Sequence, residues 1–252
     1  MRRGAHHFQF GLAVFLWAGA TAVAGEELPA VFDSANRLYE QGKFAEAASA
    51  YEKAVQSGSV SPALYFNLGN AWFKAGQTGR AIAAYRQAAQ IAPRDPELRT
   101  NLQFVRNQVQ GPTLLPGWWW RWLGTLTLNE WTVLASAVLW LWLVPLILLQ
   151  WRPGWRPALR QGILAGGIAT GLLGFCLAAA FYRGHSTPAA VVVAGQVTVH
   201  QGPLDESPGS FTLHDGAELA VLDEKGGWLQ VTAGAQRAGW IRRDQVMLLP
   251  GI

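Results

Sequence analysis

The residues whose chemistry could support catalysis are few, and they are not arranged for it. Adjacent carboxylates at positions 205–206 and 223–224 fall in predicted turns, where paired acids are usually solvated. His200 and His214 have no acidic or cysteine partner at metal-binding spacing. The chain has no GxSxG, HExxH or phosphate-loop motif. The sequence therefore predicts a protein that is not an enzyme and has no catalytic residues, no cofactor and no metal.

A second group with possible binding chemistry is the segment GWWWRWL at residues 117–123. Tryptophan rings stack on sugars and bases, but they also favour the lipid headgroup layer, where the ring is apolar and the indole N–H stays hydrated. A stacking platform needs rings spaced along a groove, whereas these are consecutive. We therefore expect a membrane-interface segment whose arginine meets lipid phosphates, formed by Trp118, Trp119, Trp120, Arg121 and Trp122.

The composition also points to a membrane. Half of the residues are hydrophobic and only 14% are charged, below the ~25% of ordinary soluble proteins. The net charge is +4, and the excess arginines flank the apolar runs: Arg2, Arg3, Arg121, Arg152, Arg156, Arg160 and Arg183. This distribution is typical of a topology signal and excludes nucleic acid as the expected partner. The single cysteine, Cys176, lies in an apolar run and excludes an intrachain disulfide.

Three apolar segments set the expected topology. Residues 1–24 have a basic start, an apolar stretch and the triplet AVA, which predicts a signal peptide, with an uncleaved anchor as the alternative. Residues 131–150 and 162–182 are each long enough to span a bilayer. The loop between them, 151–161, has three arginines and no acid, so it is predicted to be cytoplasmic. Both outer ends of this hairpin would then be periplasmic, at a bacterial inner membrane.

The second predicted span has a small residue at every fourth position, a spacing that lets another helix backbone approach closely. The expected partner is either the first span or a helix of another protein. The packing positions are Gly162, Gly166, Thr170, Gly174 and Ala178.

The region before the hairpin repeats with a period of 34 residues. The second block matches eight signature positions, namely Tyr65, Leu68, Gly69, Trp72, Ala81, Tyr85, Ala88 and Pro93. The first block keeps Ala35, Leu38, Gly42, Ala47, Tyr51 and Ala54. The region resembles tetratricopeptide repeats, which implies an all-α solenoid over 28–110, with repeats at 28–61 and 62–95 and a capping helix at 96–109.

The resemblance also implies a concave groove that binds peptides or protein segments. Asn36 and Asn70 match asparagines that bind the ligand backbone in peptide-binding members of that family. A side-chain amide both donates and accepts, which suits an extended peptide. The alternative is a set of solvated helix-face residues. The predicted groove residues are Asn36, Asn67, Asn70, Lys74 and Asn101.

After a linker at 111–130 and the hairpin, residues 188–250 change to a period of two, with short runs separated by Gly, Pro, Asp and Ser. This pattern predicts a small all-β barrel. The runs VTVHQGP, FTLHDGAEL, GGWLQV and GWIRRDQV resemble bacterial SH3 domains, some of which bind cell-wall peptides. The resemblance implies a ligand surface at Trp228 and Trp240, with a role in the barrel core or rim as the alternative.

The order of these parts resembles the BatE-like branch of the Bat (Bacteroides aerotolerance) group. That resemblance implies a non-enzymatic scaffold working beside von Willebrand A-domain membrane proteins in envelope or oxidative stress tolerance. The alternative is a peptidoglycan- or cell-wall-binding protein that acts through its SH3-like domain. A stress sensor is a weaker third hypothesis, because the predicted cytoplasmic loop offers little surface.

Overall fold

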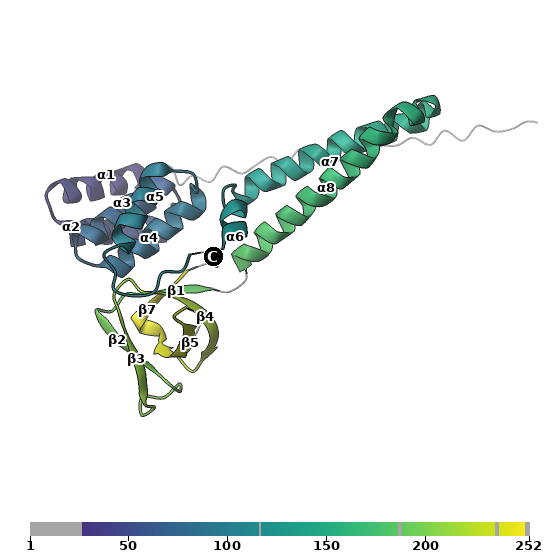
Figure 1. The fold of residues 1–252 in the computed structure, drawn as a ribbon. Coiled ribbons are helices and arrows are strands. Elements are labelled where there is room, and N and C mark those ends of the chain that lie inside the picture. Colours follow the sequence, from purple (N-terminus) through teal and green to yellow (C-terminus); the bar gives the residue numbers. More distant parts are fainter. Residues whose placement is uncertain (1–26, 116, 186–187, 235–236, 250–252) are drawn as a thin grey trace, which may run out of the picture.

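The computed structural model describes residues 27–115, 117–185, 188–234 and 237–249. The predicted signal peptide lies outside these residues. Figure 1 shows three parts: a stack of short helices, a long helical hairpin that projects from it, and a β-sheet that packs against the stack.

The N-terminal part is a stack of antiparallel helix pairs, as the repeat pattern predicts. Its helices are α1 (Glu27–Glu40), α2 (Phe44–Gln56), α3 (Pro62–Lys74), α4 (Thr78–Ile91) and α5 (Pro96–Arg106). Ser61 caps α3 and Asp95 caps α5, each followed by proline at the first helical position. Gly42 and Gly76, 34 residues apart, turn the chain after α1 and α3 with φ of 75° and 78°.

The core of the stack uses small residues where helices touch. A methyl group on Gly69 would lie 2.7 Å from the ring of Tyr85, so only glycine lets α3 and α4 approach this closely. Ala81 and Ala88 are fully buried beside them. The repeat signature therefore describes packing positions, and the structure confirms a tetratricopeptide-like helical region.

The central part consists of α6 (Trp118–Leu123), α7 (Leu128–Trp151), the 3-10 turn η1 (Pro153–Trp155) and α8 (Arg156–His185). The side chains of Thr127 and Glu130 form the capping box that starts α7. Both helices are longer than predicted, since α7 begins at 128 and α8 takes in half of the predicted loop. Each is long and apolar enough to cross a membrane. Of the most apolar 18-residue stretch in each, only 6% and 0% of the residues are buried. A core helix of a soluble domain would be mostly buried.

The C-terminal part is one antiparallel sheet in the order β3-β2-β6-β5-β4-β1-β7. Its strands are β1 (Ala189–Val192), β2 (Gln196–His200), β3 (Gly209–His214), β4 (Glu218–Lys225), β5 (Trp228–Thr232), β6 (Ala238–Arg242) and β7 (Val246–Leu249). Within the described residues the edge strands β3 and β7 do not pair with each other, so the sheet is not a closed barrel. The predicted β region is confirmed as an antiparallel sheet, without barrel closure.

The sheet packs directly on the helical stack through β1, whose four residues are all buried. Ala189 and Val191 join the hydrophobic core of the helices, whereas Ala190 and Val192 join the core of the sheet. An uninterrupted apolar run is expected for a strand covered on both faces. The run AAVVV at 189–193 therefore carries a signal for two-sided burial beyond the strand itself.

Candidate functional site

The groove side of the first repeat holds an asparagine between two hydrogen-bond donors. The Asn36 Oδ1 accepts a hydrogen bond from the Tyr51 hydroxyl at 2.5 Å and a longer one from the Asn67 side-chain amide at 3.4 Å. The three residues come from α1, α2 and α3. The tyrosine at the repeat's packing position thus reaches through the helix pair and fixes the asparagine on the groove face.

The second repeat builds the same arrangement. The Asn70 Oδ1 accepts from the Tyr85 hydroxyl at 2.6 Å and from the Asn101 amide at 3.5 Å. The two networks are related by the 34-residue repeat in all three residues. The structure thus aligns four of the five predicted groove residues on α1, α3 and α5, while Lys74 is exposed at the end of α3 and lies outside both networks.

Burial keeps both tyrosines as donors. It raises the pKa of Tyr51 and, more strongly, that of Tyr85, so both hydroxyls stay protonated at neutral pH. A protonated hydroxyl that donates to Oδ1 fixes which way each asparagine amide points. The Nδ2 groups of Asn36 and Asn70 donate to no residue in the described part of the chain. They remain as oriented donors on the groove face.

A small cavity marks the first of these networks. It has a volume of about 150 Å³ and is lined by Asn36, Tyr39, Glu40, Tyr51, Asn67 and Asn70. Sequence reasoning found the asparagines but identified the tyrosines only as positions of the repeat signature. Their offset of 15 residues from each asparagine, present in both repeats, is the signal that identifies them.

A buried ion-pair network joins strand β4 of the sheet to helices α4 and α5 of the stack, and this network is called the joint below. Glu218 of β4 is fully buried, and its carboxylate accepts from Arg86 of α4 at 3.2 Å and from Arg106 of α5 at 2.5 and 2.9 Å. The backbone N–H of Glu218 donates to the carbonyl of Pro112 at 2.9 Å. Sequence reasoning missed this joint. The sequence feature that could have indicated it is Glu218, an acid between two apolar residues at the start of a strand.

A second carboxylate, that of Asp215 in the turn just before β4, caps a repeat helix. The Asp215 Oδ1 accepts the backbone N–H of Gly79 at 3.1 Å, in the first turn of α4. Burial raises the pKa of Asp215, although hydrogen bonds from backbone N–H groups at the start of α4 oppose the shift. Gly79 has no room for a side chain, because an added Cβ would overlap the carbonyl oxygen of Val192. The turn at 214–218 is thus built into the repeat domain.

The two tryptophans of the predicted ligand surface differ in exposure, since Trp228 is buried and Trp240 is partly exposed. Trp228 is 8% exposed, and its ring contacts His200 edge-on at 5.4 Å and Arg242 at 5.3 Å. Trp240 is partly exposed and pairs with His200 across β2 and β6. The cavity here, about 300 Å³, is lined by Gln196, Val197, Thr198, His200, Asp205, Trp228, Arg242 and Gln245.

The tryptophan-rich segment forms the short helix α6, whose rings stack in a row that ends on α7. Trp119 and Trp122 stack at 5.3 Å, and Trp122 meets Trp131 at 5.6 Å. The Trp131 indole N–H donates to the carbonyl of Leu123 at 3.0 Å. The side chain of Trp118 is 74% exposed, and those of Arg121 and Trp122 are exposed as well. The arrangement presents aromatic rings and a cation beside the start of an apolar helix.

The small residues of α8 meet α7 only in part. A Cβ on Gly166 would lie 2.7 Å from the ring of Trp142, whose indole N–H donates to the carbonyl of Ile163 at 2.8 Å. Thr170 is also partly buried, whereas Gly162, Gly174 and Ala178 are exposed. A four-residue spacing drifts around a helix of 3.6 residues per turn, so the row leaves the hairpin interface.

Comparison with known proteins supports the helical part. The sequence model of the tetratricopeptide repeat family matches residues 32–96. No match was found among curated proteins. Tetratricopeptide repeats indicate a protein-interaction role, and the matched segment includes Asn36, Asn67 and Asn70. In the described residues, no three His, Cys, Asp or Glu side chains gather where they would hold a metal ion.

Proposed function

We propose that the protein is a non-enzymatic, membrane-anchored adaptor that binds a segment of a partner protein in its repeat groove. The observation that carries this proposal is the duplicated network at Asn36 and Asn70, in which internal donors occupy each carbonyl oxygen and leave each amide N–H toward the groove. Two such donors, one per repeat, suit the main-chain carbonyls of an extended peptide.

The anchoring part of the proposal rests on the hairpin. The apolar surfaces of α7 and α8 are exposed along their length, with Leu141 at 74% and Trp140 at 62%. In water this surface would strongly favour association, whereas lipid tails solvate it. Arginines at the η1 end favour the cytoplasm, so the repeats and the sheet would lie in the periplasm. The exposed rings of α6 would then sit at the outer surface of the inner membrane.

The proposed partner class comes from the resemblance of the predicted order of parts to that of the Bat group. We propose von Willebrand A-domain membrane proteins as partners, in a complex for envelope or oxidative stress tolerance. The groove chemistry is compatible with this class because it recognises a main chain and not a particular side chain.

Affinity purification of the tagged full-length protein from native membranes tests the proposal. Asn36→Asp combined with Asn70→Asp keeps an acceptor for each tyrosine but removes the amide donors, so recovery of the A-domain protein is expected to fall at least tenfold. Asn107→Asp, at an exposed position outside the groove, is the matched control and is expected to change nothing. Equal recovery with the double variant and the control would exclude the groove as the binding site.

A second candidate function uses the sheet. The cavity beside Trp228 presents the charged pair Arg242 and Asp205 together with the amides of Gln196 and Gln245, a set that suits a polar peptide of the cell wall. Co-sedimentation of the detergent-solubilised protein with purified sacculi tests it, with Gln245→Ala and Arg242→Ala, both in the cavity lining, as variants expected to reduce the sedimented fraction. Protein that stays in the supernatant would remove this function and leave the groove proposal unaffected.

A further inference from the structure

The first repeat has a helix-docking face with nothing on it in the described residues. This face is the outer groove between α1 and α2, about 580 Å³ in volume, and these two helices form the end of the stack away from the hairpin (Figure 1). Its lining is Val31, Ser34, Leu38, Glu46, Ser49, Ala50 and Lys53.

The second repeat indicates what such a face accepts. The equivalent positions, 34 residues on, include Leu68, Trp72 and Ala84, all buried in the core of the stack, where α2 packs on α3. Glu52 of α2 completes that contact, accepting from the Trp72 indole N–H at 3.2 Å and pairing with Arg80 at 3.9 Å. In this architecture the face is therefore covered by a helix whose acid meets a cation on the face.

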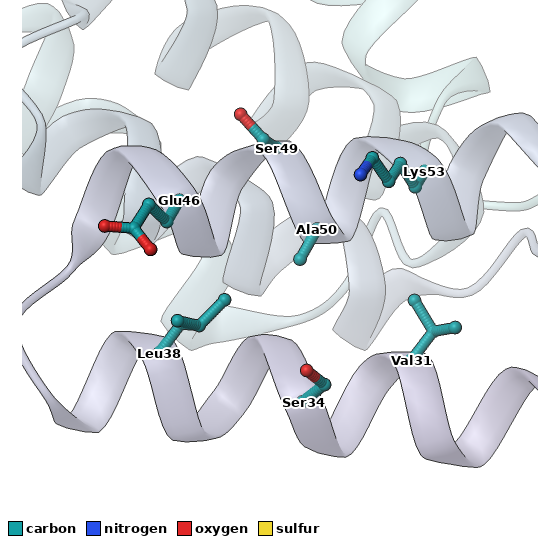
Figure 2. Close-up of a pocket in the computed structure, with 7 residues that line it drawn as sticks. All are labelled: Val31, Ser34, Leu38, Glu46, Ser49, Ala50 and Lys53. Atoms are coloured by element: carbon teal, nitrogen blue, oxygen red, sulfur yellow. The ribbon is translucent and has the colours of Figure 1, made fainter.

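The first repeat has a different charge pattern at the same place. Glu46 stands where the second repeat has Arg80, and Lys53 follows two turns later on α2. Figure 2 shows these two side chains at opposite ends of the groove, with Ser49 and Ala50 between them. A helix that docks here must offer a cation to one end and an anion to the other, and a small-residue middle lets it come close.

A copy of α2 running in the opposite direction meets both demands. We propose that two copies of this protein associate through their α1–α2 faces about a two-fold axis near Ser49 and Ala50. Each Glu46 then lies against Lys53 of the other copy, and Val31 and Leu38 flank the helix contact. Isologous dimers are built in this way, from one self-complementary patch used twice.

The proposed dimer leaves the peptide groove open. Asn36 and Tyr39 line the inner cavity, whereas Val31, Ser34 and Leu38 of the same helix line the outer groove. These two sets lie on different sides of α1, as their helical spacing requires. The inference therefore goes beyond the proposed function, and the two can fail separately.

Disulfide cross-linking of the full-length chain in native membranes tests the contact itself. In a Cys176→Ala background, Ala50→Cys is expected to give a homodimer band under mild oxidation, because the two-fold axis brings its two copies together. Thr100→Cys, exposed on α5 at the opposite end of the stack, is the control for collisions and for association through the hairpin. An Ala50→Cys dimer yield no higher than that of Thr100→Cys, or a cross-link to another protein alone, would overturn the proposal.

Charge exchange tests the antiparallel pairing. Glu46→Lys and Lys53→Glu each turn two attractive contacts into two repulsive ones, and each is expected to reduce the Ala50→Cys dimer yield about tenfold. The double variant restores the pairing and with it the yield. The two single variants, co-expressed with different tags, should prefer each other to themselves. A double variant as weak as the single variants would contradict the proposed geometry.

Discussion

The joint between the sheet and the repeats gives the sharpest stability prediction, through Glu218→Gln. The carboxylate is fully buried, and the side chains of its partners Arg86 and Arg106 are only 9% and 12% exposed. Glutamine keeps the volume and one acceptor oxygen but removes the charge that both guanidinium groups face. Removing one member of a buried ion pair costs about 3–5 kcal/mol, and we expect the lower end, about 3 kcal/mol, because one acceptor remains.

That loss is a large part of the free energy of unfolding, which for most domains is about 5–15 kcal/mol. For cooperative units of this size, about 2–4 °C of melting temperature correspond to each kcal/mol, so the expected decrease is roughly 6–12 °C. The assay is thermal unfolding of the full-length protein in detergent, followed by tryptophan fluorescence.

Glu97→Gln is the matched control, since this glutamate is exposed on α5 and its side chain pairs with no described residue. Its effect is expected to stay within about 0.5 kcal/mol. A melting temperature for Glu218→Gln within 2 °C of that control would refute the reasoning. It would mean that the two parts unfold independently and that the ion pairs add nothing to their association.

Three further predictions concern single positions. Burial raises the pKa of Asp215 in the folded state, so ionisation of this carboxyl lowers the stability of the fold at neutral pH. Asp215→Asn keeps the acceptor for α4 and should melt at or above the wild-type temperature at pH 7, and the difference should vanish as the pH falls toward 4. Asp215→Ala removes the acceptor and should lose about 1 kcal/mol. Gly69→Ala places a methyl group 2.7 Å from the ring of Tyr85 and should cost about 1–3 kcal/mol in thermal unfolding; an unchanged melting temperature would contradict the close packing of α3 on α4. Gly166→Val should lower the melting temperature in detergent because it displaces the α7 indole that packs there, and Gly171→Val, where an added Cβ meets nothing within 4 Å, should lower it less.

The sequence predicts what depends on local pattern and period. The 34-residue repeat locates Asn36 and Asn70 because equivalent helix positions face the same way, and the apolar runs locate α7 and α8 because length and composition are local properties. The joint is different in kind. Glu218 reads as a turn-flanking acid until Arg86 and Arg106, more than 100 residues away, are known to lie beside it. Barrel closure is likewise non-local, since it depends on whether the edge strands meet.

The groove and the joint share the same two helices, and this arrangement limits how either can move. On α4, Tyr85 reaches the groove asparagine while the next residue, Arg86, reaches Glu218. On α5, Asn101 joins the groove network and Arg106, little more than one turn later, binds the same carboxylate. A displacement of α4 or α5 would strain both sets of contacts at once. The sheet therefore acts as a support that holds the amide donors of the second repeat in place.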